Sequence, residues 1–296
     1  MTQEEIRGIV AATRQEGVDK LPALTIYGKQ EYIPARNGGK VRVLVNRPKA
    51  DGPRPVFFNF HGGGFIMGMP EFDDAFCQRA CDELGIVVIN VDYRLAPEFP
   101  YPAAVEDVRD VVLYVQEHAT EYGVDPTRMA IGGHSAGGTL TAGLAIWAGE
   151  TGKCSFRCQV LDYPPLDMKS SAFSKPVPPG AIPPELADVF DRCYRTPEQS
   201  GEVYCSPYYA TGEQLKKTPP AIVLTAEGDS LCAEAETYAA RLMQNSVEVT
   251  ARRFLGVGHG FSMPMPMDME GAICDDTAME EAQVMMIAGL KRYLLD

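Results

Sequence analysis

Short apolar segments alternate along this chain with longer segments of helical periodicity. Segments 55–60 and 85–93 are apolar nearly throughout, which is typical of strands buried on both faces. A helical stretch at about 71–84 separates them. Strands that alternate with helices at this spacing indicate a mostly parallel sheet with helices on both faces. We therefore expect the 296 residues to form a single α/β domain.

The same pattern continues on both sides of these segments. Further strands are expected at 41–46, 128–135, 158–163, 221–228 and 247–255. Further helices are expected around 6–12 and at 102–122, 136–148, 232–244 and 276–294.

Segment 164–220 interrupts the alternation because it holds eleven of the 23 prolines. Such a stretch cannot form regular sheet, and its tyrosines and leucines distinguish it from a flexible linker. We expect an ordered insertion that forms a small cap over the sheet together with residues 1–30. The alternative is a long surface excursion without function.

The net charge of −13 argues against two classes of partner. Binding to nucleic acid requires a basic surface, and anionic membranes repel an acidic protein. The uncharged run 129–149 reaches membrane length, but its six glycines favour a strand, a turn and a buried helix, so no membrane insertion is expected.

The cysteines and the N-terminus predict a cytoplasmic protein without a metal. The eight cysteines form no CxxC motif, no Cys/His cluster has zinc spacing, and HExxH is absent. Cysteines without the spacing of a disulfide framework are typical of cytosolic proteins, in which thiols stay reduced. The first residues carry acids where a signal peptide carries bases.

A serine motif, GHSAG at 133–137, lies between an expected strand and an expected helix. A serine at such a sharp turn takes a strained backbone conformation, and Gly133 and Gly137 provide the space. The helix that follows directs its positive end at the site. A glycine-rich packing turn would give the same bare motif, but the strand–turn–helix context favours Ser135 as a nucleophile.

A glycine loop, HGGGF at 61–65, follows the expected strand 55–60. Glycines allow backbone N–H groups to approach an oxygen closely and to stabilise the oxyanion of a tetrahedral intermediate. A phosphate-binding loop is the alternative, but the chain has neither GKS/GKT nor GxGxxG. Together with GHSAG, the loop indicates an acyl-transfer site.

A serine nucleophile needs a base, and the chain offers four histidines. His61 lies within the glycine loop, His118 lies on the polar face of an expected helix, and His134 precedes the serine and should point away from its Oγ. His259 follows the last expected strand, from where a loop can bring its ring over the carboxyl edge of the sheet. His259 is therefore the predicted base.

The base in turn needs a carboxylate. Asp229 closes an expected strand and gives the chain order Ser, Asp, His that is expected of α/β-hydrolases. Glu227 and Asp162 are the competing acids because each also lies at a strand end.

Five segments together resemble the hormone-sensitive-lipase-like esterases, bacterial family IV: HGGGF (61–65), DYRLAPE (92–98), GHSAGG (133–138), EGDSL (227–231) and HGF (259–261). The resemblance runs from about residue 55 to the C-terminus. It implies an α/β-hydrolase with a cap that cleaves short acyl esters without metal or organic cofactor. It also implies the roles of nucleophile, base and acid for Ser135, His259 and Asp229.

The resemblance further assigns the backbone N–H groups of Gly63, Gly64 and Ala136 to the oxyanion hole. It implies that His61 buttresses the glycine loop and that DYRLAPE supports the loops behind the site. Two features depart from the family. His134 stands where GDSAGG has aspartate, which leaves the subgroup and the substrate open. Ala233 stands where DPLRD has a second acid, which removes a competitor of Asp229.

The predicted function is hydrolysis of a small ester by a serine carboxylesterase. An amidase or peptidase with the same triad, or a non-catalytic ligand-binding member of the fold, are the alternatives, and the C-terminal helix could also support a homodimer. Methionines flank the predicted site and could line a short, adaptable apolar pocket or only fill gaps under the cap. They are Met67, Met69, Met263, Met265, Met267 and Met269.

Overall fold

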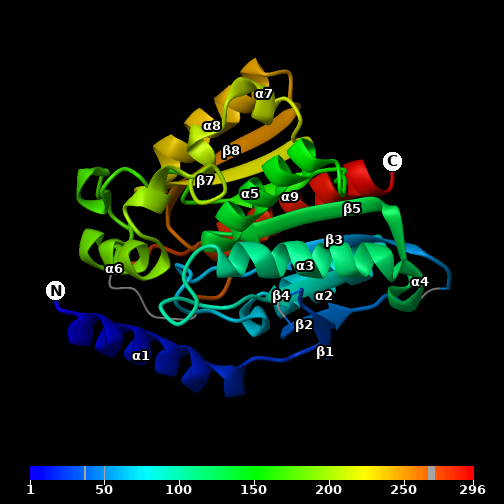
Figure 1. Ribbon diagram of the computed structural model, residues 1–296, viewed down its shortest axis with the longest axis horizontal. Helices are drawn as coiled ribbons and strands as arrows, with labels where there is room; N and C mark the ends of the chain where they lie inside the picture. Colours follow the sequence, from blue (N-terminus) through cyan, green and yellow to red (C-terminus); the bar gives the residue numbers. More distant parts are fainter. Residues whose placement is uncertain (37, 50, 266–270) are drawn as a thin grey trace.

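The computed structural model describes residues 1–36, 38–49, 51–265 and 271–296. Within these residues an eight-stranded sheet has the strand order β1-β2-β4-β3-β5-β6-β7-β8. The pairings of β2 with β1 and with β4 are antiparallel, and all pairings from β4 to β8 are parallel. Helices cover both faces of the sheet (Figure 1). The predicted α/β class with a mostly parallel sheet is therefore confirmed.

Seven of the strands match sequence predictions to within a few residues, whereas β1 was not predicted. The strands are β1 Lys29–Pro34, β2 Lys40–Asn46, β3 Arg54–Phe60, β4 Val87–Asp92, β5 Val124–His134, β6 Gln159–Asp162, β7 Ala221–Gly228 and β8 Val249–Gly258. The mostly polar β1 lies at the edge of the sheet, where of its side chains only that of Ile33 is buried, so it lacks an apolar run. The segment 1–30 that we expected in the cap therefore ends inside β1.

The helices predicted at 71–84, 136–148, 232–244 and 276–294 are confirmed to within a few residues. The helix predicted around 6–12 is part of a longer helix, the two helices within 164–220 were not predicted, and the helix predicted at 102–122 is broken. The helices are α1 Gln3–Lys20, α2 Asp74–Leu84, α3 Ala103–Glu117, α4 Ala119–Tyr122, α5 Ala136–Thr151, α6 Pro184–Tyr194, α7 Gly212–Leu215, α8 Cys232–Gln244 and α9 Asp276–Leu294. The single helix predicted at 102–122 is wrong because His118 leaves the helical conformation, with φ −105° and ψ 30°. The Nδ1 of His118 lies 2.8 Å from the carbonyl oxygen of Tyr114, and the two rings stack. None of the described helices is long and apolar enough to cross a bilayer.

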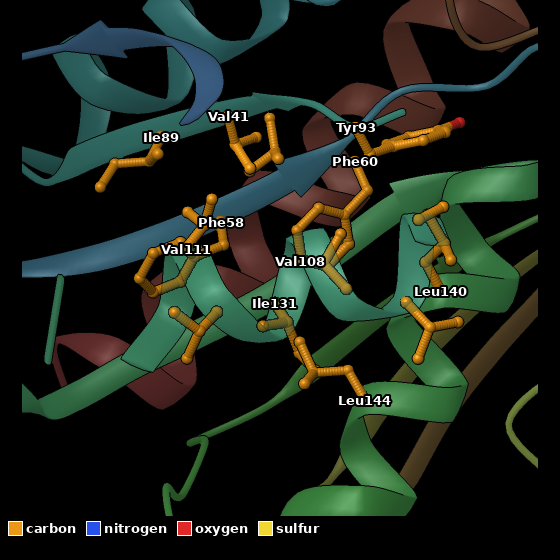
Figure 2. Close-up of a cluster of buried hydrophobic side chains, with 14 of the residues drawn as sticks. Val41, Phe58, Phe60, Ile89, Tyr93, Val108, Val111, Ile131, Leu140 and Leu144 are labelled. Carbon is orange, nitrogen blue, oxygen red and sulfur yellow. The ribbon is translucent and has the colours of Figure 1, made fainter. Parts of the chain in front are cut away.

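Alternate side chains of the central strands enter different hydrophobic layers. Phe58 of β3 packs in one cluster with α3 and α5, whereas its neighbour Phe57 packs in another with α2 and α9. Figure 2 shows the first of these clusters, in which Val108 and Val111 of α3 lie beside the sheet. Because the strands are covered on both faces, their carboxyl ends remain as the edge from which loops can build a site.

Segment 164–220 contains helices and no strand, as its proline content predicts. Its longest helix is α6, which lies near α1 in Figure 1. Ile6 and Val10 of α1 share a buried cluster with Val189 and Phe190 of α6. The same cluster contains Ile66 from the loop after β3, so both helices pack against that loop.

Candidate active site

Ser135 occupies a strained turn between β5 and α5. Its backbone has φ 51° and ψ −119°, a conformation that non-glycine residues rarely adopt. A Cβ atom added to Gly137 would lie 1.9 Å from the carbonyl oxygen of Phe60, at the end of β3. Glycine at 137 therefore allows the turn to pack directly against the neighbouring strand, which keeps the serine in place.

The structure brings Ser135, His259 and Asp229 into one chain of hydrogen bonds. The Oγ of Ser135 lies 2.9 Å from Nε2 of His259, and Nδ1 of His259 lies 2.7 Å from Oδ2 of Asp229. Their side chains are almost completely buried, with exposed fractions of 8%, 4% and 3% for the three residues. A carboxylate can only accept at this distance, so the Nδ1–H of His259 donates and leaves Nε2 free to accept from the serine.

The two competing acids lie elsewhere. Glu227 is exposed and accepts a hydrogen bond from the backbone N–H of Gly256 at 3.0 Å. Asp162 is buried and contacts Nδ1 of His134 at 2.8 Å. Among the three candidate acids, Asp229 is the one that contacts His259.

The glycine loop after β3 lies against the serine turn. Gly63 and Gly64 have φ values of +120° and +57°, in the region that favours glycine. A Cβ atom on Gly63 would lie 2.2 Å from the carbonyl oxygen of Met67, and one on Gly62 would lie 3.6 Å from Cβ of Ser135. The loop therefore approaches the serine closely, and Ala136, the third residue assigned to the oxyanion hole, directly follows Ser135.

Several contacts hold this loop from behind. His61 places Nδ1 at 2.7 Å from the carbonyl oxygen of Gly62 and stacks on the ring of Tyr93, whose hydroxyl donates to the carbonyl of His61 at 2.8 Å. From α1, Arg14 donates to the carbonyl oxygens of Ile66 at 2.6 Å and Ala96 at 2.7 Å. These contacts agree with the supporting roles implied for His61 and for the DYRLAPE segment.

A second buried polar network lies beside the serine. Asp162 accepts from His134 and from the hydroxyl of Ser262, which also lies 3.0 Å from the hydroxyl of Tyr163. Ser262 follows His259 by three residues in the same loop. Asp162 therefore links His134, which precedes Ser135, to the loop that carries His259. From the sequence, Asp162 was expected only as a competing acid, and no motif indicates its role in this network.

Burial and charge act in opposite directions on His134. Burial lowers its pKa, but the nearby charge of Asp73 and the hydrogen bond to Asp162 outweigh burial and raise the pKa above its ordinary value. Burial also raises the pKa of Asp73. The pair therefore binds protons more readily in the folded chain than in water.

A cavity opens beside Ser135 and His259. Four of the six methionines named above line it: Met67, Met69, Met263 and Met265. Met267 and Met269 lie outside the described residues. The first cavity is also lined by His134 and Asp73. The insertion contributes Ile182 and Phe190, which were not predicted because no periodic pattern marks them.

A second cavity also reaches Ser135 and is lined mainly by the insertion. Its charged lining residues are Lys175 and Asp191. Lys175 pairs with Glu234 at 2.7 Å, and burial raises the pKa of Asp191 to about 6. In the part of the chain that the structure describes, no group of three or more His, Cys, Asp or Glu side chains could hold a metal ion.

The strained serine turn, the glycine loop and the parallel sheet together define an α/β-hydrolase. Residues 57–263 match a protein family whose description is alpha/beta hydrolase fold, and the chain belongs to that family. The predicted family resemblance is therefore confirmed.

Particular relatives are named as esterases. Carboxylic ester hydrolase LipN of Mycobacterium tuberculosis is 33% identical over 247 residues, which make up 80% of this chain and 63% of LipN. The chain thus spans less than two thirds of the length of LipN. Ethyl acetate hydrolase of Pseudomonas putida is 30% identical over 269 residues, or 88% of this chain and 81% of that protein. The solved structure of a hyperthermophilic esterase from the archaeon Pyrobaculum calidifontis is similar, with a TM-score of 0.81 and 33% identity over 97% of this chain and 93% of that one.

Proposed function

We propose that this chain is a serine carboxylesterase that hydrolyses short-chain acyl esters through an acyl-enzyme. Carboxylic ester hydrolysis is the activity named for its relatives, and a serine that a neighbouring base can deprotonate is a nucleophile able to catalyse it. The observation that carries the proposal is the continuous hydrogen-bond chain from Ser135 through His259 to Asp229, which lies at the wall of a cavity.

In the first half-reaction, Ser135 Oγ attacks the ester carbonyl carbon while Nε2 of His259 takes the hydroxyl proton. The carbonyl oxygen becomes an oxyanion, which we assign to the backbone N–H groups of Gly63, Gly64 and Ala136. When the tetrahedral intermediate collapses, the carbon–oxygen bond to the alcohol breaks, and His259 returns the proton to the departing oxygen. The acyl group remains on Ser135.

In the second half-reaction, water repeats the same sequence. His259 takes a proton from the water as its oxygen attacks the acyl carbon, and the bond to Ser135 then breaks. Serine regains its proton from His259, and a carboxylic acid leaves. Asp229 stays ionised throughout and stabilises the imidazolium that forms twice in each turnover.

The preference for short acyl groups rests on the walls of the cavity. We propose that α1 and α6 act as the cap, because they pack together against the loop after β3 and because α6 contributes Phe190 to the cavity wall. The methionines give this cavity a flexible apolar lining that can adapt to small acyl groups of different shape. A cap of this kind should exclude long chains.

A panel of p-nitrophenyl esters tests the proposal. We expect kcat/KM to be higher for the acetate and butyrate than for the octanoate and palmitate. Ser135→Ala should lower kcat by about 10⁶-fold while leaving the melting temperature nearly unchanged, because alanine fits the site and only the nucleophile is lost.

Three outcomes would contradict parts of this proposal. Activity of Ser135→Ala within tenfold of the unmodified chain, in a preparation free of host esterase, would exclude the serine mechanism. A preference for palmitate would identify a lipase. Faster turnover of matched anilides than of esters would favour the amidase alternative, and tight ligand binding without turnover would favour a receptor.

A further inference from the structure

Two cavities meet at Ser135, and the same few residues border both of them. The shared lining residues are Gly64, Ser135, Ile182 and Phe190. Gly64 and Ser135 belong to the loop and the turn that form the common floor. The bulky side chains that border both cavities are therefore those of Ile182 and Phe190.

Phe190 lies directly on the glycine loop. A Cβ atom on Gly64 would lie 2.5 Å from Cδ2 of the Phe190 ring, so the ring occupies the space above that glycine. Phe190 is 9% exposed and packs in the buried cluster with Ile6 and Val10 of α1. Because Phe190 belongs to this buried cluster, its ring cannot move away without disturbing the packing there.

The two cavities also differ in chemistry. Among the described residues, the first is lined by four methionines together with Asp73 and histidines and by no lysine or arginine, whereas the second has the oppositely charged Lys175 and Asp191. The acyl and alcohol groups of an ester leave the carbonyl carbon in different directions. Two separate cavities that both reach the nucleophile can therefore take one group each.

We propose that Phe190, assisted by Ile182, is the partition that keeps the acyl and alcohol groups of the substrate in separate cavities and sets the longest acyl chain accepted. This inference rests on the proposed esterase function and names two specificity-determining residues for it. Removal of the partition joins the two cavities. A long acyl chain can then extend into the space of the alcohol, provided that the alcohol leaves this space empty.

The experiment compares two ester series that differ in the size of the alcohol. Methyl esters leave the alcohol cavity nearly empty, whereas p-nitrophenyl esters fill it. For Phe190→Ala, we expect the ratio of kcat/KM for octanoate to that for butyrate to rise about tenfold or more in the methyl series. The ratio should change much less in the p-nitrophenyl series.

Two further variants complete the design. Ile182→Ala should change the ratio in the same direction and decides the question if Phe190→Ala does not fold. Phe173→Ala is the matched control because Phe173 lies in the same insertion, is 59% exposed and lines neither cavity. It should leave both ratios unchanged.

An equal rise in both series would overturn the partition, because general loosening of the cap would affect both alike. An unchanged ratio in both series would overturn it as well. If the unmodified chain shows no hydrolysis that depends on Ser135, the esterase function itself is wrong. If such hydrolysis is present and only the ratios fail to move, the partition alone is wrong.

Discussion

Asp229→Asn tests the chain of hydrogen bonds most sharply, because the surroundings of Asp229 determine how the asparagine amide must lie. One carboxylate oxygen accepts from Nδ1 of His259 at 2.7 Å, and the other accepts from the backbone N–H of Leu231 at 3.0 Å. Asparagine offers one acceptor and one donor group. Its oxygen must face the N–H of Leu231, since the reverse orientation would set two donors against each other. Its NH₂ group then faces Nδ1 of His259.

This orientation forces the wrong histidine tautomer. Nδ1 must accept from the amide, so the proton of the neutral ring moves to Nε2, which then cannot take the proton of Ser135. We expect kcat to fall by roughly 10⁴-fold, as in other triads with this substitution. That factor corresponds to about 5.4 kcal/mol of transition-state stabilisation. Asp229 is 3% exposed, so water cannot replace the lost acceptor.

The assay is turnover of p-nitrophenyl acetate at neutral pH, with thermal unfolding to show that the variant is folded. Glu227→Gln is the matched control, because Glu227 accepts only from Gly256 N–H among the described contacts, and a glutamine oxygen can do the same. It should lose far less activity. A larger loss in Glu227→Gln than in Asp229→Asn would show that the acid is misassigned.

Two further predictions concern stability. Gly137→Ala should destabilise the chain by more than about 3 kcal/mol in urea unfolding, because the added Cβ atom would lie 1.9 Å from a backbone oxygen. Gly8→Ala is the control: Gly8 lies on α1 in open space, so alanine there should stabilise the chain by about 0.5–1 kcal/mol. Asp191→Asn should stabilise the chain above pH 6. Burial raises the pKa of Asp191 from 3.8 to about 6, so the folded chain holds a proton on Asp191 more tightly than the unfolded chain does. Protonation of Asp191 therefore stabilises the folded chain fully below pH 3.8, and this stabilisation is lost as the pH rises through 6. The gain should reach at most about 3 kcal/mol at pH 8 and vanish near pH 4, and a pH-independent difference in melting temperature would contradict it.

The sheet could be predicted from the sequence because its central strands are apolar on both faces. The runs at 55–60 and 85–93 contain β3 and β4 almost residue for residue. Where a strand has only one buried side chain, as β1 has with Ile33, no run is visible and the strand was missed. The break at His118 was missed for a different reason: it is accompanied by a contact between the side chain and the backbone, which periodicity does not record.

The predicted catalytic groups lie together because each follows a strand of the sheet. Ser135 follows β5, Asp229 follows β7 and His259 follows β8, and the carboxyl ends of parallel strands meet at one edge. Chain order and strand ends therefore suffice to bring them within reach of one another. The link from His134 through Asp162 to Ser262 could not be predicted in this way, because it depends on side-chain orientation.

The walls of the cavities follow no such rule. Ile182 and Phe190 come from an insertion without sheet periodicity, and their place beside Ser135 depends on how α6 packs against α1. If the proposed function holds, substitutions there should change which esters fit while the strand ends that hold the proposed triad stay unchanged. The motifs of the sheet therefore predict the class of reaction, whereas we propose that packing in the insertion decides the substrate. For this reason the proposed partition at Phe190 is a more informative site for changing specificity than any residue of the proposed triad.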